Sequence, residues 1–194
     1  MAREHTRTAG ACLMLLASVA ALSCGGVQVA PSAPLDQSAT SLYPLRAGYA
    51  WSYDVDSGDG QSVLATSRVV RVHDGSADVM TGQAIQTYLI RREGIQKSSG
   101  AFFLLPAALD ASSHWASGPD AEARVISTQE QLQTPAGSFR SCVAVQEQNR
   151  SSGQQITTTY CPAVGPVRVV SQMEVRGQIV RVEALLRGYT SEAL

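Results

Sequence analysis

VRVVSQMEVRGQIVRVEALL, residues 167–186, predicts a β-hairpin with a tight turn at Arg176-Gly177. Around that turn, apolar side chains of the first strand face mostly apolar side chains of the second. The expected pairs are Met173–Val180, Ser171–Val182, Val169–Ala184 and Val167–Leu186. Charged and amide side chains occupy the other face, because successive residues of a strand point to opposite sides. A shift of one residue would place Met173 against Arg181, so the pattern specifies a single register.

The same alternation of apolar and polar residues recurs along the chain after residue 40. Trp51, Tyr53 and Val55 alternate with polar residues before Gly58 and Gly60 end the run. Segments of this kind follow one another at spacings of about 8–12 residues, and no amphipathic helix of any length interrupts them. The expected fold is therefore all-β, either a single antiparallel β-sandwich or a curved half-barrel.

The N-terminus has the pattern of an export signal. Arg3 and Arg7 precede the uncharged run ACLMLLASVAALS (residues 11–23), which is shorter than the roughly 20 residues of a relaxed membrane span. The run ends at Cys24, and this junction resembles the lipobox of bacterial lipoproteins, in which the cysteine is lipidated and becomes the new N-terminus. Cleavage by the ordinary signal peptidase after Ala20 is the alternative.

These features divide the chain into a signal peptide (residues 1–23), a flexible tether (24–40) and an antiparallel β domain (41–194). The tether is small, polar and proline-bearing, which is typical of linkers. By the lipoprotein resemblance, the absence of Asp at position 25 favours the outer membrane over the inner one. We expect an acyl chain such as palmitate to hold the domain at the envelope, facing the periplasm or the cell surface.

Cys142 and Cys161 are predicted to form a structural disulfide. A hairpin turn at residues 150–153 places Val143 opposite Tyr160 and sets the two cysteines opposite each other, at a Cα separation that a disulfide tolerates. Export exposes the chain to an oxidising compartment, where disulfides persist. A metal site would need about four ligands, and a redox-active pair would be favoured by Cys-x-x-Cys spacing; neither pattern is present. We expect no metal and no cofactor.

Composition and motifs also disfavour several classes of function. The formal net charge of −1 offers no electrostatic footprint for nucleic acid. The sequence has no Gly-x-Ser-x-Gly motif, and His73-Asp74, an imaginable base with its orienting acid, is more typical of a polar turn. We therefore expect a protein that is not an enzyme, with a hydrolase as the least favoured alternative.

Six aromatic residues are candidates for lining an apolar pocket, with the first four favoured: Trp51, Tyr53, Phe102, Trp115, Tyr88 and Phe103. The alternative is that they only fill the core, as most large aromatic side chains do. A cavity of at least about 300 Å³, lined by these residues and open at one end, would distinguish the two interpretations.

Several short motifs, taken in order, resemble a group of uncharacterised bacterial envelope lipoproteins. The pattern runs YPLxxGxxWxY, then LLP with a tryptophan downstream, then TPAGxFxxC and YxPxVGxV. The matching residues are Tyr43-Pro44-Leu45, Gly48, Trp51 and Tyr53; Leu104-Leu105-Pro106 and Trp115; Thr134-Pro135-Ala136-Gly137, Phe139 and Cys142; and Tyr160, Pro162, Val164-Gly165 and Val167. The resemblance implies a β-rich periplasmic or surface domain with no established activity. Such sheets are similar to the curved half-barrels that carry lipoproteins through the periplasm.

Together these observations predict an exported, lipid-anchored envelope protein with a non-enzymatic structural or interaction role. The alternative is a carrier that holds an apolar ligand, a lipid or a lipoprotein in a β cup. The expected partners are the membrane, reached through the N-terminal lipid, and an envelope protein or apolar ligand.

Overall fold

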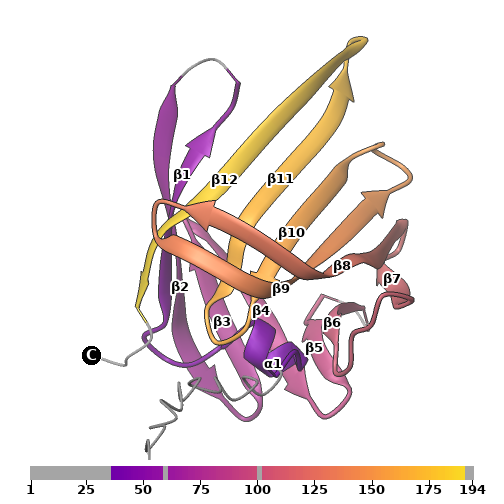
Figure 1. Ribbon diagram of the computed structural model, residues 1–194. Helices are drawn as coiled ribbons and strands as arrows, with labels where there is room; N and C mark the ends of the chain where they lie inside the picture. Colours follow the sequence, from indigo (N-terminus) through magenta and orange to yellow (C-terminus); the bar gives the residue numbers. More distant parts are fainter. Residues whose placement is uncertain (1–35, 59–60, 100–101, 191–194) are drawn as a thin grey trace, which may run out of the picture. The chain divides into compact units, whose positions relative to one another are not determined.

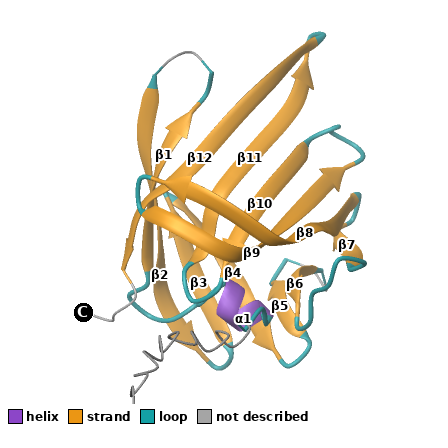
Figure 2. Cartoon of the chain, in the orientation of Figure 1, coloured by secondary structure: helices purple, strands orange, loops and turns teal. Residues whose placement is uncertain are grey.

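The computed structural model describes residues 36–58, 61–99 and 102–190. The described residues form one short helix and twelve strands (Figure 1, Figure 2). The elements are α1 (Ala39–Leu42), β1 (Ala50–Asp56), β2 (Ser62–His73), β3 (Ser76–Thr81), β4 (Ala84–Arg91), β5 (Gly94–Lys97), β6 (Phe103–Pro106), β7 (His114–Gly118), β8 (Ala121–Thr134), β9 (Gly137–Asn149), β10 (Gln155–Cys161), β11 (Gly165–Val175) and β12 (Gln178–Thr190). The predicted signal peptide, Cys24 and most of the predicted tether lie outside the described residues. Within the described ranges, no helix is long and apolar enough to cross a membrane.

All twelve strands belong to one antiparallel sheet. Its strand order is β6-β5-β4-β3-β2-β1-β12-β11-β10-β9-β8-β7, so almost every neighbour in space is also a neighbour in sequence, apart from the pairing of β1 with β12. The sheet curls until it is nearly closed (Figure 1). The all-β prediction is therefore confirmed, and of its two forms the curved, barrel-like sheet is observed.

The hairpin of β11 and β12 has the register that the sequence predicts. Met173 pairs with Val180, Ser171 with Val182 and Val169 with Ala184. Arg176 and Gly177 both have positive φ, at 54° and 79°, as a two-residue turn that matches the strand twist requires. The predicted apolar face is buried only at the positions farthest from the turn, Val167 and Leu186. At the end of the hairpin Met173 and Val180 are exposed, because no other strand covers them.

Contacts between the two edges of the sheet hold the curl. The Trp115 indole on β7 donates a hydrogen bond to the carbonyl of Phe103 on β6, at 3.1 Å. Lys97 on β5 donates to the carbonyl of Ser117 on β7 and forms an ion pair with Glu147 on β9, both at 3.1 Å. These contacts bring strands from opposite ends of the sheet order together.

Helix α1 and the segment around it pack against this sheet. The Ser38 hydroxyl caps the helix by accepting a hydrogen bond from the Ser41 amide. Leu42 and Tyr43 are buried in the core, and Gln37 donates hydrogen bonds to the carbonyls of Thr128 and Ser141. Residues 37–40, assigned by sequence to the tether, therefore already contact the folded domain.

The hairpin of β9 and β10 brings the two cysteines together. Val143 pairs with Tyr160, as expected, and Val145 pairs with Thr158 in the same register. Cys142 and Cys161 are joined by a disulfide, and both are buried. Because a buried disulfide is shielded from thiols in solution, this position suits a structural bond.

Candidate functional site

The inner face of the curled sheet encloses an open cavity of about 310 Å³. Alternate residues of several strands line it, since side chains of a strand point inward at every second position. The lining residues are Tyr43, Tyr53, Val55, Ala65, Ser67, Thr81, Tyr88, Leu104, Thr158, Tyr160, Pro166, Val169 and Ala184. No charged residue is among them, so the cavity offers an apolar and aromatic surface with a few hydroxyl groups.

Four tyrosine side chains contribute polar groups to this cavity beside the Ser and Thr hydroxyls, and the phenols remain uncharged. The Tyr53 hydroxyl donates to the carbonyl of Pro166 at 3.0 Å, and the rings of Tyr43 and Tyr88 pack edge to face with their centroids 5.6 Å apart. Burial raises the pKa of the Tyr43, Tyr53, Tyr88 and Tyr160 phenols above the ordinary value. Neutral phenols whose polar ends are partly satisfied leave their ring surfaces to contact a ligand.

The apolar lining continues beyond the cavity toward the ends of two hairpins. Ala184 lines the cavity, and Val182 and Val180 follow it on the same face of β12 at steps of two residues. Val180 faces Met173, and both are exposed. On β2, Val63 lies two residues before a lining position and is 62% exposed. An apolar path thus leads from the cavity to the open end of the sheet.

The six aromatic residues predicted for a pocket lie in different environments. Tyr53 and Tyr88 line the cavity, as the pocket interpretation expects. Trp51 belongs to the core: its side chain is 1% exposed and donates a hydrogen bond to the carbonyl of Val164 at 2.7 Å. Phe102 and Phe103 do not line this cavity, and Trp115 lines a different pocket. The predicted set is therefore not brought together at one site.

Sequence reasoning missed Tyr43 and Tyr160 as cavity residues. The sequence indicated that Tyr160 points inward, because the predicted hairpin register pairs it with the apolar residue Val143. The structure has the same pair, and Val143 is buried. Tyr43 lies in an irregular segment after α1, where no strand or helix periodicity indicates the direction of its side chain.

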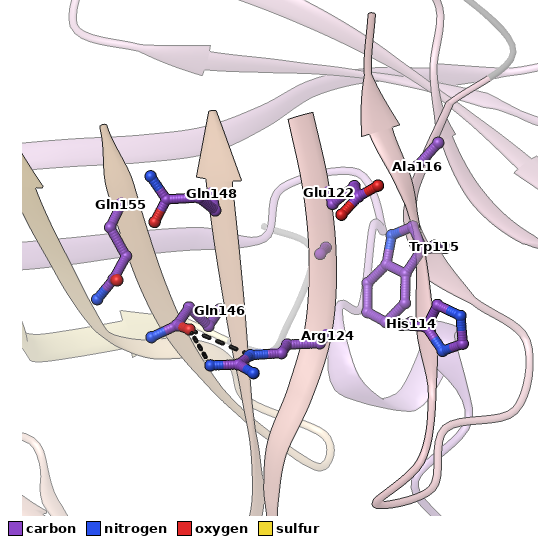
Figure 3. Close-up of a pocket in the computed structure, with 9 residues that line it drawn as sticks. His114, Trp115, Ala116, Glu122, Arg124, Gln146, Gln148 and Gln155 are labelled. Atoms are coloured by element: carbon purple, nitrogen blue, oxygen red, sulfur yellow. Dashed lines mark hydrogen bonds between the residues drawn. The ribbon is translucent and has the colours of Figure 1, made fainter. Parts of the chain in front are cut away.

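A second pocket, of about 410 Å³, lies over strands β7 to β10 (Figure 3). It is lined by His114, Trp115, Ala116, Glu122, Ala123, Arg124, Gln146, Gln148 and Gln155. On β10, Thr158 and Tyr160 point into the inner cavity. Gln155 is separated from Thr158 by an odd number of positions, so its side chain points to the outer face of the sheet. We call this second pocket the outer pocket. The guanidinium of Arg124 donates two hydrogen bonds to the Gln146 side-chain oxygen, at 3.2 and 2.8 Å, drawn as dashed lines in Figure 3.

Metal-ligating side chains do not cluster in the described part of the chain. No group of three or more His, Cys, Asp or Glu residues is placed there to hold an ion. His114 borders the outer pocket, whereas His73 lies at the end of β2.

Comparison with known proteins gives two solved structures of similar architecture. One is a protein thought to be exported, with a YmcC-like fold, from Bacteroides fragilis; it is 13% identical, with 76% of this chain and 98% of that chain covered and a TM-score of 0.44. The other is thought to be a lipoprotein, from Parabacteroides distasonis; it is 15% identical, with 79% and 100% covered and a TM-score of 0.41. No family model matches the sequence, and no curated protein matches it significantly. Similarity at this level says nothing about what this chain binds.

Proposed function

We propose that this protein is exported, anchored to the outer membrane by a lipid on Cys24, and binds an elongated apolar ligand such as an acyl chain inside its curled sheet. The cavity of about 310 Å³ on the inner face is the observation that carries the proposal. Its volume reaches the roughly 300 Å³ that distinguishes a ligand pocket from a filled core. The proposed role is binding and not catalysis.

The composition of the cavity supports an apolar ligand. Its lining includes four tyrosine rings and aliphatic side chains from five strands and from Pro166, and no charged group. A charged ligand would lose its hydration without gaining a partner there, which is costly, whereas apolar surface gains about 25 cal/mol for each Å² removed from water.

The exposed apolar path supports an elongated ligand. The lining is extended along β11 and β12 to the open end by Val182, Val180 and Met173. Apolar side chains that gather on an exposed surface are typical of a site that binds a ligand or partner. A chain that begins in the cavity and continues along this path would cover both surfaces.

The sequence first predicted a structural or interaction role. That role does not require a cavity. The carrier role uses both the cavity and the path, so it is the function that the geometry favours. Export and the anchor rest on the signal and the cysteine at positions 1–24 of the sequence. Fatty-acid labelling of the wild type that persists in Cys24→Ala would contradict the anchor.

Displacement of a fluorescent fatty acid tests the ligand. The experiment uses a periplasmic Cys24→Ser protein, so that its own lipid cannot occupy the cavity. Ala65→Phe fills the cavity and should weaken binding by about tenfold or more, equivalent to about 1.4 kcal/mol. Thr66→Phe is the matched control, because it adds a similar side chain to the exposed, opposite face of β2. Equal binding by both variants, or no binding by the parent protein, would contradict the proposal.

A further inference from the structure

The outer pocket is built from two rows of polar side chains that cross four strands in register. In one row, Gln155 of β10 pairs with Gln148 of β9, Gln148 with Glu122 of β8, and Glu122 with Ala116 of β7. The second row runs parallel to it through Thr157, Gln146, Arg124 and His114. Neighbouring strands are about 4.8 Å apart, so each row presents polar groups at a regular spacing.

The pocket has hydrogen-bonding capacity that the protein does not use. Within the described ranges, no hydrogen bond joins the side chain of Gln148 or Gln155 to another residue. Each of these amides carries two N–H donors and a carbonyl acceptor. Gln146 uses only its oxygen, which accepts from Arg124, so its two donors also remain. Donors and acceptors are therefore mixed across the pocket (Figure 3).

The charges of the pocket nearly cancel. Arg124 is held by Gln146, and Glu122 forms an ion pair with Arg150 at 2.6 Å. An anionic ligand would meet the Glu122 carboxylate, and a cationic ligand would meet Arg124. A lipid is also a poor match, because sites for apolar ligands are lined mainly by apolar side chains and this one is not.

A neutral ligand rich in hydroxyl groups satisfies all these conditions, since a hydroxyl both donates and accepts hydrogen bonds. Trp115 also borders the pocket at the β7 side (Figure 3), but on its strand it lies between His114 and Ala116, and its indole donates to the carbonyl of Phe103 on β6. We propose that this outer pocket binds a neutral sugar chain that lies across strands β7 to β10. The site faces away from the inner cavity, so it does not depend on the proposed acyl ligand.

Side-chain amide signals in nuclear magnetic resonance spectra give a direct test. The ¹⁵N-labelled Cys24→Ser protein is titrated with neutral oligomers of α-linked glucose, β-linked glucose and N-acetylglucosamine. At least one oligomer should shift the side-chain amide signals of Gln146, Gln148 and Gln155. The Gln148→Ala, Gln155→Ala double variant should bind that oligomer about tenfold more weakly, because two hydrogen-bonding groups are lost.

The matched control removes two exposed amides of β8 that lie outside the pocket, in a Gln129→Ala, Gln131→Ala double variant. It should bind the oligomer as the parent protein does, and both double variants should keep the parent's melting temperature. No shift with any neutral oligomer would overturn the proposal. Preferred binding of an oligogalacturonate that is lost in salt would overturn the neutral class, and a stronger shift with a neutral extended peptide would overturn the sugar assignment.

Discussion

Gly165 and Trp51 pack the start of β11 directly onto the start of β1. Gly165 has φ of +107°, and a Cβ atom there would lie 2.8 Å from the Trp51 indole nitrogen. That indole donates its hydrogen bond to the carbonyl of Val164, the preceding residue. The turn therefore needs glycine for two reasons, its backbone conformation and its contact with the ring.

Gly165→Ala should lower the free energy of unfolding by about 2–4 kcal/mol, because it combines a left-handed backbone cost with overpacking against the indole. Gly177→Ala is the matched control: its φ is +79°, but no atom lies within 4 Å of the added methyl group. The control should lose only the backbone part, about 1–2 kcal/mol. Urea unfolding followed by tryptophan fluorescence measures both. Equal losses would show that the indole contact adds nothing.

The sequence predicts toward which face of a strand a side chain points. It does not predict whether that side chain is covered by the core or lines the cavity. Period-two alternation places Trp51 and Tyr53 on the same face of β1, and both point inward. Where the cavity lies along that face depends on neighbouring strands, which the sequence of β1 does not specify. Trp51 is therefore covered by the turn at Val164-Gly165, whereas Tyr53 remains at the cavity wall.

Among the elements, the hairpin of β9 and β10 is cross-linked by a disulfide. Its disulfide joins Cys142 and Cys161 across 19 residues of sequence. Thr158 and Tyr160 of the same hairpin line the inner cavity, but the cysteines themselves do not. The bond should therefore matter for stability and not for contact with a ligand.

The Cys142→Ala, Cys161→Ala double variant should lose about 2–4 kcal/mol of stability while binding the fatty acid with unchanged affinity where it is folded. Urea unfolding and fluorescence displacement measure the two quantities. Peptide mapping without reduction should recover the two cysteine peptides linked to each other from protein expressed in the periplasm. Free thiols there, or full stability of the variant, would contradict a structural role.

Hairpin registers could be predicted because a turn and an alternating pattern fix them locally. The β9–β10 and β11–β12 pairings both follow from residues within one hairpin. The sequence predicted a curved half-barrel as one of two forms but could not decide between it and a sandwich, because the curl depends on bulges such as the shift between Ser52 and Tyr53 and on long-range contacts such as Lys97 with Glu147. Neither leaves a periodic signal in the sequence.

For the whole domain, the two faces of one sheet have different chemistry. The inner face holds the uncharged, aromatic cavity, and the outer face over β7 to β10 holds the polar pocket. The sequence predicted strands with one apolar face, which a filled sandwich and an open curved sheet share. Only the nearly closed single sheet leaves a cavity between its own strands, so the candidate site depended on the fold as a whole.

Native mass spectrometry with envelope lipids shows whether the curled sheet holds an apolar ligand. The periplasmic Cys24→Ser protein is incubated with an envelope lipid extract, separated from free lipid and measured intact. We expect a species heavier by one lipid for the parent and for Thr66→Phe, and its loss in Ala65→Phe. A parent protein that carries no lipid, or an Ala65→Phe protein that retains it fully, would contradict ligand binding inside the sheet.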